Sequence, residues 1–208
     1  MTSTSSSPTV PSSARQIGIL LFDGVEELDA VGPWEVLAYW TRTYPEDGYT
    51  VSCISRDGAP VTAAKGLVLA AHFAVGEAPS FEVFVHPGGR GTRRLARDSA
   101  HLNWIRDLRE SVPLMASVCT GSLVYAAAGL LSGRPATTYW AAVEELRELD
   151  PSVEIRAQDR WVDDGDIVTS AGVSAGIDMA LHLVRRLAGA DRARDVRRGI
   201  QYDPEPPV

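Results

Sequence analysis

Apolar residues along the chain fall into two patterns: short continuous runs, and longer segments in which they recur every three or four positions. The short runs predict buried β-strands at residues 16–22, 49–55, 81–86 and 113–118. The longer spacing predicts helices at residues 32–44, 100–110, 120–131, 139–149 and 174–189. This alternation predicts an α/β fold in which a mostly parallel sheet is covered by helices on both faces.

The remaining segments carry weaker patterns. Turn residues indicate a hairpin within residues 57–71, and further strands are indicated at residues 152–157 and 160–170, the latter turned at Asp164-Gly165. Pro33 falls in the first turn of the helix predicted at 32–44. The Ser/Thr/Pro-rich residues 1–15 predict a disordered tail, and residues 16–208 a single domain. Residues 202–208 are expected to form an extended tail.

Composition excludes several classes of protein. The 208 residues are 45% hydrophobic and 23% charged, which is ordinary for a globular protein, and the net charge of −7 argues against nucleic-acid binding. The two cysteines, Cys53 and Cys119, form no CxxC pair, so we expect reduced thiols and no metal site. No signal peptide and no run approaching the roughly 18 apolar residues of a membrane span is present. We therefore expect a cytoplasmic protein without a membrane partner.

Three segments end at the carboxyl edge of the predicted sheet, where ligands bind in folds of this class. FDGVEELDAVG follows the first strand, HPGGRGT follows strand 81–86, and CTGS follows strand 113–118. We expect the chemistry of this protein to lie where these segments meet.

Cys119 lies between small residues, in Ser-Val-Cys-Thr-Gly, where strand 113–118 meets helix 120–131. A nucleophile on a sharp strand-to-helix turn needs small neighbours, and the first helical amides favour its thiolate form. A buried cysteine without a chemical role fits the same pattern, because free cysteine is often buried. Both interpretations stay open for Cys119. For Cys53, in the middle of strand 49–55, the pattern favours a place in the core.

Carboxylic acids and glycines surround this candidate site. Of Glu26, Glu27 and Asp29, which follow the first strand, Asp29 has apolar neighbours and is expected to point inward. Burial would raise the pKa of its carboxyl group and let it donate a proton to the sulfur. Gly88 and Gly89 would let backbone amides form an oxyanion hole, although a plain turn explains them equally well.

The four histidines offer little for a Cys–His dyad. His86 ends a strand near the candidate site and is the single partner to consider, but a structural role is favoured.

Four stretches together resemble the ThiJ/PfpI superfamily, in family order and from about Gln16 to Pro207. They are IGILLFDGVEELDAVGPWEVL, HPGGRGT, SVCTGSLVYAAAGLLSGRPATTYW and TSAGVSAGIDMALHLV. The resemblance implies a flavodoxin-like α/β sandwich with a cysteine on a nucleophile elbow. It also implies a carboxylic acid from the first strand-helix loop beside the sulfur, and a homodimer.

Within this superfamily, protease-like members carry Cys-His-Gly, whereas this chain has Thr120 after the cysteine. The local motifs resemble the isocyanide hydratase branch. The resemblance implies a cofactor-independent enzyme that converts a small-molecule isocyanide into an N-substituted formamide. Cys119 is then the nucleophile, with Asp29 and Thr120 beside it, and Gly88, Gly89 and Gly121 are the expected substrate or oxyanion contacts. His86 and Tyr139 depart from the family pattern and are expected near the pocket.

Two alternatives remain. The same motifs resemble the sensor domain of AraC-type regulators, which would here lack its helix-turn-helix module because the basic residues 191–200 are too short to form one. Glyoxalase-like or redox-responsive cysteine chemistry is also compatible with Asp29 beside Cys119.

Overall fold

A computed structural model describes residues 14–203. Residues 1–13 of the expected disordered tail and residues 204–208 of the expected extended tail lie outside the described residues. The first strand begins at Arg15, so this residue belongs to the sheet rather than to a tail.

A seven-stranded sheet forms the centre, in the order β10-β11-β7-β6-β1-β2-β5. All neighbouring strands are parallel except β10 and β11, which form the antiparallel pair expected around Asp164-Gly165. Its strands are β1 (Arg15–Leu20), β2 (Tyr49–Ser55), β5 (Phe73–Ala74), β6 (Phe81–His86), β7 (Leu114–Val118), β10 (Trp161–Asp163) and β11 (Ile167–Ser170). Two small sheets lie outside it: the expected hairpin of β3 (Val61–Thr62) and β4 (Val68–Leu69), and β8 (Pro135–Ala136) beside β9 (Glu154–Ile155).

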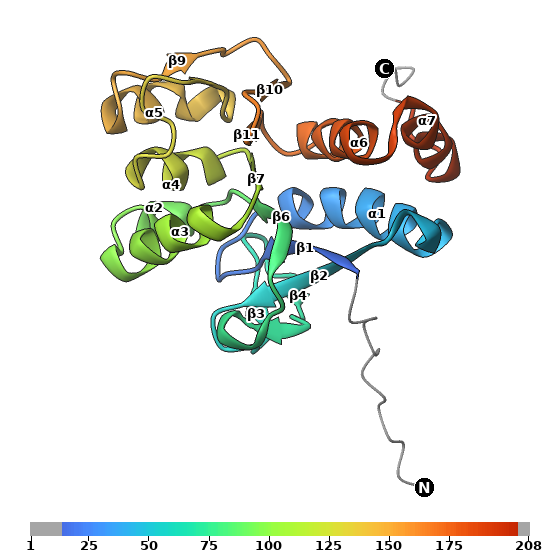
Figure 1. Cartoon of the computed structure of the whole chain (residues 1–208). Coiled ribbons are helices and arrows are strands. Elements are labelled where there is room, and N and C mark those ends of the chain that lie inside the picture. Colours follow the sequence, from blue (N-terminus) through green and yellow to red (C-terminus); the bar gives the residue numbers. More distant parts are fainter. Residues whose placement is uncertain (1–13, 204–208) are drawn as a thin grey trace, which may run out of the picture.

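Helices cover both faces of the sheet (Figure 1). One layer contains α1 (Glu27–Thr43), α6 (Ala175–Ala188) and α7 (Ala190–Gly199). The other contains α2 (Thr92–Leu95), α3 (Ser99–Ser111), α4 (Gly121–Ala127) and α5 (Val143–Leu149). Short 3₁₀ turns occupy Pro45–Asp47, Val75–Glu77 and Trp140–Ala142. The doubly wound α/β class predicted from the sequence is confirmed.

The central strands are buried on both faces. Every residue of β7 is buried, as are five of the six residues of β1, which explains why these strands read as continuous apolar runs. Cys53 lies in β2 and is 8% exposed, so its expected place in the core is confirmed. Along the described residues, no helix has the length and apolar character needed to cross a membrane.

Helix α1 begins five residues before the expected start, so the acidic segment is its first turn rather than a loop. Glu27 and Asp29 lie at the positive end of the helix dipole, which favours their negative charge. Pro33 therefore lies inside the helix, and its expected place in the first turn is wrong. It is tolerated there although it cannot donate a hydrogen bond to the preceding turn.

Helix α7 was not predicted, because residues 190–199 are mostly charged and contain few apolar residues. Tertiary contacts hold it in place. Arg192 donates to Asp47 at 2.7 Å and stacks over the ring of Tyr44, and Val196 is buried. Other elements are shorter than expected. Helix α4 ends at Ala127 rather than at residue 131, residues 139–149 divide into a 3₁₀ turn and α5, and residues 152–157 contribute only the two residues of β9.

Candidate functional site

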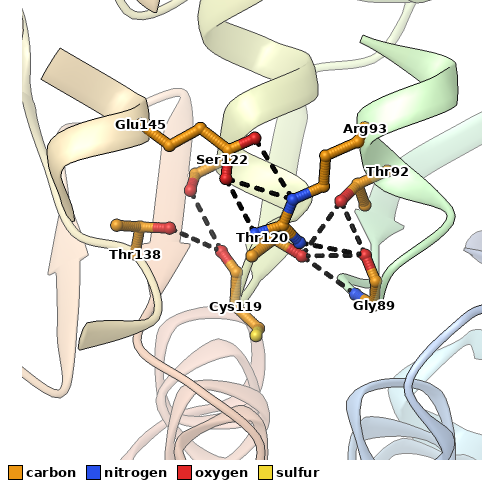
Figure 2. Close-up of polar contacts among 8 residues, drawn as sticks. All are labelled: Gly89, Thr92, Arg93, Cys119, Thr120, Ser122, Thr138 and Glu145. Carbon is orange, nitrogen blue, oxygen red and sulfur yellow. Dashed lines mark hydrogen bonds and ion pairs between the residues drawn. The ribbon is translucent and has the colours of Figure 1, made fainter. Parts of the chain in front are cut away.

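Cys119 occupies the turn between β7 and α4 with a backbone φ of 56°, a left-handed conformation that is uncommon outside glycine. Its N–H donates to the Ser170 carbonyl at 3.0 Å. Its own carbonyl accepts hydrogen bonds from Ser122 Oγ at 3.0 Å and Thr138 Oγ1 at 3.1 Å (Figure 2). Strand β11, helix α4 and the segment after β8 therefore all contribute to fixing the turn that carries the sulfur.

Gly121 permits the close approach of this turn to the end of β6. A Cβ atom at this position would overlap the backbone carbonyl of His86 and lie 3.0 Å from that of Pro87. The sequence placed Gly121 among the expected ligand contacts, whereas the geometry gives it a role in packing helix α4 against the neighbouring strand.

Asp29 points inward from the first turn of α1 and is fully buried. The Gly88 N–H donates to its Oδ2 at 3.0 Å, while Oδ1 has no partner within ordinary hydrogen-bond limits. Burial raises the pKa of this carboxyl group to about 7, although interactions with the Cys119 side chain, Gly88 and the Val173 backbone lower it. Asp29 can therefore hold or release a proton near neutral pH.

The Cys119 thiol shares this environment. Burial, followed by the charge of Asp29, raises its pKa to about 12. This raised pKa disfavours the expected thiolate in the resting site, where Cys119 is only 5% exposed and α4 is a short helix of seven residues. Asp29 raises the pKa of the Cys119 thiol, whereas the hydrogen bond with the thiol lowers the pKa of Asp29, so the two groups titrate as a coupled pair.

The glycine amides of the 88–89 segment are already bonded within the protein. Gly88 N–H holds Asp29, and Gly89 N–H donates to Thr120 Oγ1 at 2.9 Å. Thr120 Oγ1 also contacts Thr92 Oγ1 at 3.1 Å, and Thr92 donates to the Gly89 carbonyl at 2.7 Å (Figure 2). The expected oxyanion hole is not formed by these two amides, which instead tie the acid and the elbow together.

Val173 is a site residue that the sequence did not reveal. Its φ of 52° is a rare conformation for a β-branched residue, and its backbone lowers the pKa of both Asp29 and Cys119 through hydrogen bonding. The only sequence signal was its place between Gly172 and Ser174 in the loop after β11.

An ion pair flanks the elbow on its outer side. Arg93 of α2 donates through Nη2 to Glu145 Oε2 of α5 at 2.7 Å, and through Nε to the same carboxylate (Figure 2). Arg93 directly follows the HPGGRGT segment, and nothing in the sequence indicated its partner on α5.

His86 and Tyr139 occupy different surroundings. Both ring nitrogens of His86 contact groups other than Cys119, namely the Pro87 carbonyl and His101, so no Cys–His dyad forms. The ring of Tyr139 packs directly on Gly172, where a Cβ atom would overlap it. Tyr139 therefore lies against the loop that carries Val173.

The reactive pair is enclosed. Cys119 and Asp29 line none of the three principal cavities along residues 14–203, which measure about 470 to 590 Å³. Within the same residues, His, Cys, Asp and Glu side chains form no cluster of three or more that would hold a metal ion. The site therefore offers a thiol and a carboxyl group that are both almost fully buried.

Gly88→Ala tests the packing of this site. The new Cβ would lie 2.5 Å from Thr120 N and 2.7 Å from Asp29 Oδ2, so we expect the free energy of unfolding to fall by about 1–3 kcal/mol. Chemical denaturation measures this change. Gly76→Ala is the matched control, because its Cβ would meet open space. Equal stability of the two variants would contradict the described packing.

Comparison with known proteins places this site in a family context. The chain matches the model of the DJ-1/PfpI family over residues 15–186. It is 41% identical over 194 residues to the isonitrile hydratase of Pseudomonas putida, covering 93% of this chain and 81% of that protein. It is 32% identical over 184 residues to the HTH-type transcriptional regulator CdhR of Pseudomonas aeruginosa, covering 88% of this chain and 54% of the regulator.

Among solved structures, a ThiJ/PfpI family protein from Pseudomonas syringae has a TM-score of 0.84 with 29% sequence identity. The match covers 99% of this chain and 85% of the other. The resemblance stated from the sequence motifs is confirmed.

Proposed function

Because the chain belongs to the DJ-1/PfpI family, we propose that it hydrates isocyanides to N-substituted formamides through Cys119, without a cofactor. One observation carries the proposal: a buried carboxyl group faces a buried thiol, and no histidine joins them. An isocyanide carbon must receive both a nucleophile and a proton, and this pair supplies both at one place.

In the first half of the reaction, the Cys119 thiol gives its proton to the Asp29 carboxylate, and the sulfur attacks the isocyanide carbon. A carbon–sulfur bond forms, and the electron pair released onto that carbon is protonated by Asp29. The product is a thioimidate, in which the former isocyanide carbon carries hydrogen, sulfur and a C=N bond. Asp29 ends this half as a carboxylate.

In the second half, water attacks the thioimidate carbon while Asp29 accepts its proton. The carbon–sulfur bond of the tetrahedral adduct then breaks, and the sulfur leaves as thiolate. Proton transfers return the thiol and place a hydrogen on nitrogen, which releases the formamide. A carboxyl group with a pKa of about 7 suits this alternation between acid and base.

The enclosure of the sulfur supports a slender reactive group. Cys119 is 5% exposed, and the Gly88–Gly89 amides are bonded within the protein. An isocyanide is linear at the reacting carbon and develops no oxyanion when sulfur attacks, so it needs neither a wide opening nor an oxyanion hole.

Incubation with cyclohexyl isocyanide in H₂¹⁸O tests the proposal. We expect the product to be N-cyclohexylformamide containing one ¹⁸O atom, which mass spectrometry detects. Absence of formamide from several alkyl and aryl isocyanides would contradict the proposed substrate class.

A second candidate function is ligand sensing, favoured by the similarity to the regulator CdhR. A sensor would bind its ligand reversibly and leave it unchanged. Calorimetry with isocyanides and dicarbonyls, followed by analysis of the recovered ligand, distinguishes saturable binding from turnover.

We further propose that the protein is a homodimer in the cytoplasm. Leu28 and Val31 lie one turn apart on α1, and each keeps 36% of its surface exposed, so they offer an apolar contact beside the site. A monomeric mass in light scattering would contradict the dimer.

A further inference from the structure

A chain of hydrogen bonds that does not include Cys119 ends at Asp29. Its last member is the peptide between Pro87 and Gly88, whose N–H donates to Asp29 Oδ2 at 3.0 Å. The carbonyl oxygen of this same peptide contacts His86 Nδ1 at 2.8 Å, and His86 Nε2 contacts His101 Nε2 at 3.2 Å. Four groups therefore stand in line: His101, His86, one peptide and the carboxyl group.

The partners define the protonation of both imidazoles. A carbonyl oxygen only accepts, so Nδ1 of His86 carries the hydrogen. Burial keeps His86 neutral with a pKa of about 3, and its Nε2 is then an acceptor. His101, whose burial lowers its pKa to about 4, must consequently donate through Nε2. Every donor in the chain points toward Asp29.

The ring of His86 is held rigidly in this orientation. It is fully buried, and aromatic rings pack around it with centroids at 5.5 Å for Phe22, 5.9 Å for Tyr125 and 6.4 Å for Phe84. Such a cage leaves the imidazole no free rotation, so the Pro87 carbonyl keeps its donor.

We propose that His86 and His101 are positioning residues that hold and polarise the Pro87–Gly88 peptide, and through it set how readily Asp29 gives up its proton. A hydrogen bond to a peptide carbonyl strengthens the N–H of the same peptide as a donor. The strengthened Gly88 N–H stabilises the charged form of Asp29. This inference concerns the site of the proposed function, but it can be tested without the hydratase reaction.

Other charged groups act on the two ends of the chain. Glu26 and Cys119 act on Asp29, whereas Asp98, Arg56 and Arg94 act on His101. Replacing His86 or His101 therefore changes the hydrogen-bond chain to Asp29 without removing any of these charged groups.

The readout is the pH dependence of Cys119 alkylation by iodoacetamide, followed by peptide mass spectrometry. His86→Leu removes both ring nitrogens. We expect the lower apparent pKa in the profile of Cys119 alkylation rate against pH to rise by about 0.3 to 1 pH unit. His86→Asn places an amide donor where Nδ1 stood and should restore most of the wild-type profile.

His101 provides a second pair of variants, which stays informative if His86→Leu fails to fold. His101→Leu should shift the profile in the same direction by a smaller amount, and His101→Gln, which keeps a donor near the Nε2 position, should not. His182→Gln is the matched control, because His182 lies on α6 and bonds Asp163.

Unchanged profiles in both leucine variants would overturn the proposal. Equal shifts in the leucine and amide variants would overturn it as well, because the loss would then follow from packing rather than from the donor. If formamide production fails but these shifts appear, the role of the hydrogen-bond chain stands and the proposed substrate is wrong.

Discussion

Replacing Cys119 by alanine is expected to lower kcat/KM for an isocyanide by at least about 10⁴-fold, because the variant has no atom that can attack the carbon. The loss should lie in kcat, since the thioimidate cannot form. Steady-state formamide production measures it, and a mass spectrum of wild-type protein quenched during turnover should show the isocyanide mass added at Cys119.

Cys53→Ala is the matched control for this experiment. Cys53 is the second cysteine, and burial raises the pKa of its thiol to about 12 within β2. We expect its replacement to leave turnover unchanged, with a small loss of stability from the removed sulfur. Full activity of Cys119→Ala would refute the nucleophile, whatever the substrate.

Replacing Asp29 by asparagine is expected to lower kcat by about 10²- to 10⁴-fold. The variant is expected to fold as the wild type does. Asparagine keeps an oxygen for the Gly88 N–H but cannot accept the thiol proton or return a proton to carbon. The wild-type rate should change around pH 7, where burial has moved the pKa of Asp29. The residual rate of the variant should show no such transition.

The same variant should be more stable than wild type at alkaline pH. The pKa of Asp29 is raised from its ordinary value of 3.8 to about 7, so the folded protein binds this proton more tightly than the unfolded chain does. Wild-type stability therefore falls as the pH rises from about 4 to about 7 and stays reduced above it. The difference is at most about 4 kcal/mol, because one pKa unit corresponds to about 1.4 kcal/mol.

Denaturant unfolding at pH 4 and pH 8 measures this difference. The free energy of unfolding of Asp29→Asn, relative to that of wild type, should be higher at pH 8 than at pH 4. The variant would then be more stable than wild type at pH 8 although it has lost most of its activity. A variant that is destabilised more at pH 8 than at pH 4 would show that Asp29 is held as a stabilising charge, contrary to the described burial.

Sequence patterns could predict the elements that are buried on both faces and the three segments that meet at the sheet edge. Cys119 was placed on the elbow and Asp29 was expected to point inward because small and apolar neighbours report local geometry. The start of α1 was missed, since its first turn is acidic and its proline lies inside the helix. Helix α7 was missed because Arg192 and Val196 are held by distant parts of the chain.

The internal bonds of the site could not be predicted, because they depend on which groups face one another after folding. Gly88 and Gly89 suggested free amides, but their partners are Asp29 and Thr120, both distant in sequence. The protonation of Cys119 was likewise misjudged, because the helix dipole is a local signal whereas burial beside Asp29 is a tertiary one. Sequence shows which residue types are present, and the fold decides which of their atoms remain free.

The elbow draws its contacts from segments near both ends of the chain: α1 supplies Asp29, and the end of β11 supplies the carbonyl that holds Cys119. No short stretch of the chain contains both of them. The site therefore forms only after segments that are far apart in the sequence have come together, and contacts of this kind slow folding. A partly folded chain in which α1 has not docked would therefore carry the Cys119 thiol without the Asp29 carboxyl group beside it.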